Sequence, residues 1–351
     1  MLTAHGTAPT VESLPAPEDP LRVARKSLAV AVGIALCASL TALSLFVGSG
    51  DLTWSQSWDA LTGHSASPDG IIVREYRVPR TLLAIVVGAA LGAAGAVIQA
   101  VTRNPLADPG LLGVNSGAFL AVAVGAAFLG VSGVAGQVWL GLAGALATAV
   151  VVHLVGTSGR QGRNPVHLVL AGIAIGAVLN GVGHGVTLLA PEVFDRIRFW
   201  QVGSLQGRQI DVLWGVLPFV AAGLVITVAL TRSLNTLALG DDLARSLGSR
   251  VLLVRGLGFT AITLLCGAAT AAVGPVSFLG LMVPHAVRAV VGPDQRWIVP
   301  LSLVAAPVVF LGADILGRVV IAGELPVGIV TAFVGSPVLV WLVRRTEVKA
   351  P

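Results

Sequence analysis

The chain has 351 residues, of which 55% are hydrophobic and only 11% are charged, and its mean hydropathy is +0.89. A soluble domain carries about 25% charged residues, so this composition excludes a water-soluble fold and makes lipid the main solvent. The formal net charge of +5 gives no support for nucleic-acid binding, because the basic residues gather in loops between apolar runs.

A bilayer admits only helices or closed barrels, since every backbone polar group must be satisfied within the protein. The apolar runs extend for about 20 residues without the alternation of a barrel strand. We therefore predict an all-α, polytopic membrane protein. The 43 glycines allow helices to approach closely, and Cys37 and Cys266 fall within apolar runs, where no disulfide framework is indicated.

The chain begins with a segment rich in Pro, Thr, Ser and Glu, which is typical of a disordered tail and is assigned to residues 1–24. Arg22, Arg25 and Lys26 then precede an apolar run from Leu28 to Val47. This run is longer than the apolar part of a signal peptide, so it is predicted to be an uncleaved first span.

The membrane domain is predicted to occupy residues 25–345, followed by a second tail at 346–351. Apolar runs bounded by charges, Pro and Gly predict about ten spans. The eighth is short and contains Pro284 and His285, so a half-span is the alternative there. The predicted spans are 27–47, 80–102, 112–131, 136–156, 166–190, 212–231, 256–274, 277–291, 297–317 and 325–343.

An even number of spans places both termini on one side of the membrane, and the distribution of Lys and Arg decides which side that is. Of the 22 basic residues, 15 fall in the two termini and in the loops after spans two, four, six and eight. That side is predicted to be cytoplasmic. The opposite loops hold only Arg74, Arg77, Arg80, Arg196, Arg198, Arg208 and Arg318.

Five motifs follow one another along the chain. They are Arg77-Val-Pro-Arg80-Thr-Leu-Leu, leading through Gly88, Gly92 and Gly95 to Gln99; the loop from Arg103 to Gly117; Leu237 to Gly248; Gly274 to Arg288; and Glu324-Leu-Pro-Val-Gly328. Together they resemble the iron-siderophore, haem and cobalamin (FecCD-type) permease family of ABC importers. The resemblance covers the chain from about residue 25 to its end.

The resemblance implies the ten-helix fold of a type II ABC importer permease in the bacterial cytoplasmic (inner) membrane, with both termini cytoplasmic. The implied partners are a second permease copy, identical or a sister chain, two cytoplasmic ATPase subunits and an extracytoplasmic substrate-binding protein. No cofactor is implied. The motifs are most similar to those of ferric-siderophore permeases, and cobalamin and haem remain alternative substrates.

A short helix outside the membrane is predicted at about 239–248. Asp241 or Asp242 can cap it, Leu243 and Leu247 share one face, and Gly248 suits the position after its end. By periodicity alone, it is a loop helix lying on its own bundle. The resemblance instead makes it the coupling helix that docks in the ATPase, formed by Gly240, Asp241, Asp242, Leu243, Ala244, Arg245, Leu247 and Gly248, with Leu243, Arg245 and Leu247 as contacts.

Arg77 and Arg80 lie at the mouth of span two, and Arg318 lies at the end of span nine. Arginine at a helix end is often explained by snorkelling of its long side chain to the membrane surface. The matching positions of the family include arginines that pair with acidic residues on the binding protein. The resemblance therefore assigns Arg77, Arg80 and Arg318 to a docking surface, where exposed ion pairs steer and orient the partner.

Two further segments are candidates for the transport pathway. The polar stretch from Pro191 to Arg208 resembles a short helix that caps the pathway entrance, with Phe199 and Trp200 at an outer gate; interfacial aromatic anchors are the alternative. Asn180 and His184 lie one turn apart within span five. They are predicted either to line the pathway between two permease copies or to form interhelical hydrogen bonds.

Other classes of protein find little support. No second ligand stands near His285 at metal-site spacing, and neither a protease constellation nor a Walker A motif is present, so the chain must use a separate ATPase. An ion-coupled secondary transporter usually carries several ionisable groups at mid-membrane, and here only Asp314 and His184 qualify. Asp314 is expected to be neutralised by Arg318, one helical turn away.

Overall fold

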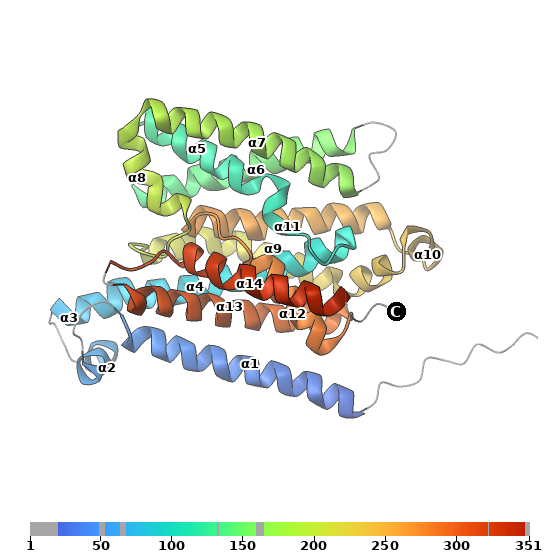
Figure 1. The fold of residues 1–351 in the computed structure, drawn as a ribbon, viewed down its shortest axis with the longest axis horizontal. Coiled ribbons are helices and arrows are strands. Elements are labelled where there is room, and N and C mark those ends of the chain that lie inside the picture. Colours follow the sequence, from blue (N-terminus) through green and yellow to red (C-terminus); the bar gives the residue numbers. More distant parts are fainter. Residues whose placement is uncertain are drawn as a thin grey trace, which may run out of the picture.

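The computed structural model describes residues 20–48, 53–63, 68–131, 133–158, 165–321 and 323–347, and within these ranges every regular element is helical (Figure 1). The elements are α1 (Pro20–Phe46), α2 (Trp54–Thr62), α3 (Pro68–Ile71), the π-helix η1 (Ile72–Arg77), α4 (Val78–Thr102), the 3-10 helix η2 (Pro109–Leu112), α5 (Val114–Phe128), α6 (Val134–Thr157), α7 (Pro165–Leu189), α8 (Pro191–Gln201), α9 (Ile210–Ala238), α10 (Asp241–Ser246), α11 (Val251–Val273), α12 (Leu279–Val291), α13 (Gln295–Val320) and α14 (Val327–Glu347).

The apolar helices coincide with the predicted spans. Among the described residues, seven helices are long and apolar enough to cross a membrane: α1, η1 with α4, α6, α7, α9, α11 and α13. Three shorter apolar helices, which are α5, α12 and most of α14, occupy the remaining predicted positions. Helix α12, at the position of the eighth predicted span, has 13 residues and contains Pro284. The all-α, ten-helix prediction is confirmed.

Two boundaries differ from the predictions. Helix α1 begins at Pro20, so residues 20–24 form its first turns instead of belonging to the tail. Helix α14 continues to Glu347, beyond the predicted end of the membrane domain at 345. In both places charged residues extend a helix past its apolar part, because a helix end in water still satisfies its own backbone. Residues 1–19 and 348–351 lie outside the described residues.

Helix α4 lies at the centre of the bundle. Nearly every residue from Leu83 to Val101 is buried, and the helix packs against α9, α11, α12 and α13. Small residues permit this close approach. A Cβ atom at Gly92 would lie 2.5 Å from the carbonyl oxygen of Ser302 on α13, and one at Gly95 would overlap the carbonyl oxygen of Gly280 on α12.

The bundle has two distinct ends (Figure 1). At one end lie α10, the beginning of α1 and the end of α14; this is called the α10 end. At the other lie α2, α3 and α8; this is called the α8 end. Helices α5, α6 and α7 pack together as one group, and α1 packs along α13 on the opposite side of the molecule. Candidate functional residues occur at both ends.

Candidate functional site

Helix α10 is a short, two-faced helix between α9 and α11. Leu243 and Leu247 are 49% and 60% exposed, whereas Ala244 between them is completely buried. The predicted apolar pair therefore faces away from the bundle. The helix ends in a Schellman motif, in which Ser249 N–H donates to Ala244 and Gly248 N–H to Arg245, with Gly248 at φ +81°.

The predicted side-chain cap of α10 is wrong. Gly240 occupies the N-cap position with φ +103°, and no side chain caps the helix. Asp241 and Asp242 lie instead within the first turn, where the free N–H groups of a helix favour negative charge. The backbone conformation at Gly240 is one that residues with a Cβ rarely adopt, which explains glycine at this position.

The two aspartates of α10 differ in their surroundings. Asp242 is fully exposed and pairs with Arg245 at 2.9 Å. Asp241 faces the bundle, where its Oδ1 lies 2.8 Å from Nη2 of Arg255 on α11 and 3.3 Å from Nη2 of Arg103 at the end of α4. The sequence does not reveal either partner of Asp241, because Arg255 stands 14 residues after it and Arg103 lies far before it in the chain.

The loop that follows α4 folds back into the bundle. Arg103 ends α4 with φ +53°, and Asp108 caps the 3-10 helix η2 by accepting a hydrogen bond of 2.7 Å from Gly110 N–H. Burial raises the pKa of the Asp108 carboxyl, while the Gly110 N–H lowers it. Helix η2 packs against α4, α5, α7 and α11, so this loop connects helices from both sides of the molecule.

A cluster of buried charges lies at the α8 end. Asp314 on α13 pairs with Arg318 one turn later, as predicted, and it also accepts hydrogen bonds of 2.8 and 3.0 Å from Arg80 on α4. Arg80 extends further to Glu324, with Nη1 2.8 Å from Oε2. The side chains of Asp314 and Arg318 are each only 1% exposed. The cluster joins α4, α13 and the segment that precedes α14.

Two arginines of this region close the end of α1. Arg77 donates to the carbonyl oxygens of Leu45 and Phe46 at 3.1 and 3.0 Å. Arg318 donates to the carbonyl oxygens of Ser44 and Val47 at 2.9 and 3.1 Å. The last carbonyls of a helix lack intrahelical partners, so these guanidinium groups satisfy the C-terminus of α1.

The three arginines assigned to a docking surface are therefore mostly buried in this chain, and the docking itself stays a prediction. Arg77 and Arg318 are 4% and 6% exposed, and Arg80 is largely covered as well. The physical reason is that Asp314, Glu324 and the end of α1 already provide partners for the three guanidinium groups. A cavity of about 400 Å³ opens beside them and is lined by Arg77, Arg80, Arg318 and Glu324 together with residues from η1 and the loop after α8.

Asn180 and His184 lie on an exposed face of α7 and are connected to neighbouring helices. Asn180 Nδ2 donates to Ser116 Oγ on α5 at 2.9 Å, and the His184 ring tilts against Phe119 with ring centroids 5.0 Å apart. His184 Nδ1 lies 2.8 Å from the carbonyl oxygen of Asn180, and its Nε2 lies 3.3 Å from Nε2 of Gln201 at the end of α8. The predicted interhelical hydrogen bond is thus present, and the alternative, that both residues line a pathway between two permease copies, stays a prediction.

The two aromatic residues predicted at the outer gate have different surroundings. Phe199 is half exposed, with Arg198 stacked over its ring at 5.1 Å. Trp200 is buried, 2% exposed, and its indole N–H points at the carbonyl oxygen of Ala271 on α11, 3.4 Å away. Trp200 therefore anchors α8 to the bundle and offers no surface to a pathway, because its large apolar ring is more stable among α11 side chains than in water.

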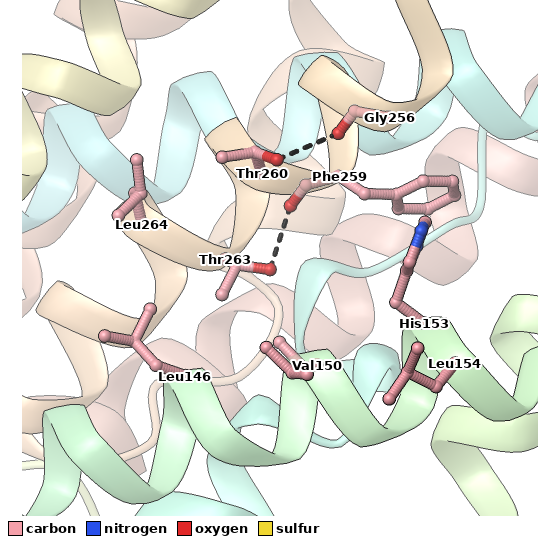
Figure 2. A pocket seen from close by; sticks show the side chains of 10 residues that line it. Leu146, Val150, His153, Leu154, Gly256, Phe259, Thr260, Thr263 and Leu264 are labelled. Carbon is pink, nitrogen blue, oxygen red and sulfur yellow. Dashed lines mark hydrogen bonds between the residues drawn. The ribbon is translucent and has the colours of Figure 1, made fainter. Parts of the chain in front are cut away.

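A second cavity, of about 360 Å³, lies between α6 and α11 (Figure 2). Its walls are mostly apolar, and the hydroxyls of Thr260 and Thr263 donate to carbonyl oxygens of their own helix, those of Gly256 and Phe259. His153 on α6 is the main polar side chain left to face the space, with its ring beside Phe259. Across the described ranges, no three His, Cys, Asp or Glu side chains gather as metal ligands would.

The chain is a polytopic helical bundle with a small amphipathic helix at one end and a helical cap at the other, an arrangement that fits the membrane subunit of a transporter. The chain belongs to the FecCD transport family, whose model matches residues 21–345. It is a subunit of an ABC importer and not an enzyme, since ATP hydrolysis in this family belongs to a separate subunit.

Relatives of the chain have nearly its full length. Ferric enterobactin transport system permease protein FepD of Escherichia coli (strain K12) is 49% identical over 321 residues, covering 91% of this chain and 96% of that protein. Probable siderophore transport system permease protein YfiZ of Bacillus subtilis (strain 168) is 38% identical over 312 residues, covering 89% and 92%. A solved structure, described as an inward-facing metal-chelate type ABC transporter, shares the fold with a TM-score of 0.80 at 24% identity, covering 91% of this chain and 99% of that one.

Proposed function

We propose that this chain is the membrane-spanning subunit through which ferric siderophores are imported across the bacterial cytoplasmic membrane. The observation that carries the proposal is its 49% identity, over nearly the whole chain, to a ferric enterobactin permease. A second relative is likewise described as a siderophore permease. Cobalamin and haem are the substrates to be tested against this proposal.

The proposed partners are cytoplasmic ATPase subunits at the α10 end, a binding protein at the α8 end and a second permease copy. Support for the first is the exposed pair Leu243 and Leu247, which leaves an apolar face on α10 that the chain itself does not cover. The excess of Lys and Arg in the termini and in the loops at the α10 end supports a cytoplasmic position for that end and for both termini.

The α8 end receives the binding protein in this proposal, with Arg80 and Glu324 nearest to the cavity beside them. Because Arg77 and Arg318 are held by the end of α1, they act mainly by fixing the shape of this surface. The second copy is proposed to pack near the exposed face of α7 that carries Asn180 and His184, so that these two side chains line a pathway between two chains, with Phe199 near its entrance.

One observation weighs against an ion-coupled secondary transporter. Such a carrier needs ionisable groups that can change their charge state at mid-membrane. Asp314 is the acid inside an apolar run, but it is held between the guanidinium groups of Arg80 and Arg318. Both carboxylate oxygens of Asp314 are therefore already engaged by guanidinium groups.

The ATPase contact is tested by co-purification. The double variant Leu243→Asp/Leu247→Asp is expected to lose the ATPase subunit, because it places two charges on the apolar docking face. Leu106→Asp is a matched control, since Leu106 is a 43% exposed leucine in the loop beside Arg103, outside α10. Retention of the ATPase by the double variant would contradict the proposed contact.

The substrate is tested on the binding protein that co-purifies with the permease. Titration with a ferric catecholate siderophore, haem and cobalamin should give tight binding of the siderophore alone. Tight binding of haem or cobalamin, with no binding of the siderophore, would overturn the substrate assignment while leaving the permease class intact.

A further inference from the structure

We propose that Asp241 is a positioning residue that joins the coupling helix α10 to the ends of α4 and α11, so that movement of α10 reaches the helices of the pathway. This inference rests on the proposed ATPase contact of α10 and adds the residues that carry the movement onward. In this proposal, α10 has an outer face, where the ATPase docks, and an inner face that carries the Asp241 carboxylate.

The backbone connections of α10 are poorly suited to transmit movement. Gly240 precedes the helix with φ +103°, and Gly248 follows it with φ +81°. Each glycine breaks the helical path, so α10 continues neither α9 nor α11 as a rigid rod. Its position relative to the bundle must then be fixed by side-chain contacts.

The carboxylate of Asp241 connects α10 to two other helices. Its Oδ1 lies 2.8 Å from Arg255 Nη2 and 3.3 Å from Arg103 Nη2, and its Oδ2 lies 3.7 Å from Arg245 Nη2. Arg255 is one turn into α11 and its side chain is 7% exposed, while Arg103 is the C-cap of α4. Three helices therefore meet at one acidic side chain.

The Asp241 carboxylate balances the positive charges that meet at this junction. Without it, the guanidinium groups of Arg103 and Arg255 would face each other as like charges, and the side chain of Arg255 is largely buried. Like charges at short distance repel, most strongly where water is scarce. The end of α4 and the start of α11 are thus held together through Asp241.

Further contacts continue from the end of α4 into the bundle. Gln99, one turn before Arg103, donates to the carbonyl oxygen of Leu281 at 2.9 Å and accepts from Arg288 Nη2 at 3.2 Å, both on α12. The loop that starts at Arg103 leads into η2, which packs against α7, the helix that carries Asn180 and His184. A displacement of Asp241 accordingly acts on α4, α11, α12 and α7.

The test uses the complete complex of permease, ATPase and binding protein in proteoliposomes. Three quantities are measured: ATPase retained on purification, ATP hydrolysed, and ferric siderophore imported per ATP. For Asp241→Asn we expect full retention of the ATPase, because Leu243 and Leu247 are unchanged, continued hydrolysis, and at least about a fivefold fall in substrate imported per ATP. Asp211→Asn, which alters an exposed acid at the far end of α9, is the control and should match the wild type.

A double-mutant cycle separates the junction from a general effect on folding. Arg103→Gln leaves the Asp241 and Arg255 pair intact and should also lower import per ATP. The double variant Asp241→Asn/Arg103→Gln should be no worse than Asp241→Asn alone, since Asp241→Asn already removes the charge pair that Arg103→Gln removes. Asp241→Glu, which keeps the carboxylate, should restore part of the coupling.

The proposal is overturned if Asp241→Asn and Arg103→Gln import as much per ATP as the wild type. Loss of the ATPase from Asp241→Asn would also overturn it, because Asp241 would then belong to the docking face. If Asp241→Asn cannot be purified, Arg103→Gln is tested alone. In that case, an amount of siderophore imported per ATP equal to that of the wild type would overturn the proposal. Failure of the proposed function is distinguishable, since in that case the wild-type complex itself would show no ATP-dependent import.

Discussion

Removal of the Asp314 carboxylate is expected to destabilise the chain more than any surface substitution. Asp314→Ala takes the central acid from between Arg318 and Arg80, whose side chains are 1% and 12% exposed. Breaking a buried ion pair by removing one partner costs about 3–5 kcal/mol, because it leaves an uncompensated charge. Arg80 keeps Glu324, and Arg318 keeps the carbonyls of α1, so the lower limit of about 3 kcal/mol applies.

The loss is measured by thermal unfolding of the purified permease in detergent, followed with a thiol-reactive dye. Cys266 is buried and becomes reactive on unfolding, and Cys37, which is partly exposed, is first replaced by Ser. A loss of about 3 kcal/mol should lower Tm by about 4 °C. The matched control is Asp195→Ala, which breaks an exposed pair with Arg198 and should cost less than about 0.5 kcal/mol.

Two results would show whether the ion pairs of the charge cluster or the apolar packing around them stabilise this part of the chain. If Asp314→Ala unfolds within about 1 °C of Asp195→Ala, the cluster contributes little and the reasoning is refuted. The double variant Asp314→Leu/Arg318→Met should recover part of the lost stability, because apolar residues of similar volume often replace a buried ion pair without loss.

Two further predictions concern packing and the gate helix. Gly95→Ala should prevent purification of folded protein, because the new Cβ overlaps the carbonyl oxygen of Gly280; the measurement is size-exclusion chromatography. Gly181→Ala is the control and should elute as the wild type does, because no atom lies within 4 Å of the added Cβ. Trp200→Ala should lower Tm by several degrees, because truncation of a buried Trp costs about 3–5 kcal/mol. Phe199→Ala is the control and should change Tm little, since Phe199 is half exposed. Equal effects of the two variants would contradict the assignment of Trp200 as an anchor.

The fold could be predicted well because the property that defines it is local. Apolar runs of about 20 residues fix each span, and all ten predicted spans coincide with apolar helices. The shortness of the helix at 279–291 was also visible in the sequence, from the length of its apolar run and from Pro284. The boundaries at Pro20 and Glu347 were missed because charged residues can extend a helix beyond the membrane without changing the apolar pattern.

The surroundings of individual site residues could be predicted only where the partner is near in sequence. The pair of Asp314 and Arg318 follows from helical spacing, and the exposed face of Leu243 and Leu247 follows from periodicity. The bond from Arg80 to Asp314 spans 234 positions, so no local pattern reveals it.

Burial of arginine and tryptophan shows the same limit of local patterns. Arg77 closes the end of α1, a helix placed beside it only by the packing of the bundle. Trp200 follows the exposed Phe199 directly, and the sequence alone does not say which of two adjacent aromatic side chains turns toward α11. Such residues reveal their roles only when the neighbouring helices are in place.

The central claim is that this chain forms the membrane passage of an ATP-driven importer of ferric siderophores. It is tested most directly by uptake of an iron-59-labelled ferric siderophore into proteoliposomes that contain the permease, its ATPase and its binding protein. Uptake is expected to require ATP and to disappear in Leu243→Asp/Leu247→Asp. Uptake that proceeds at the same rate without ATP, or in that double variant, would contradict it.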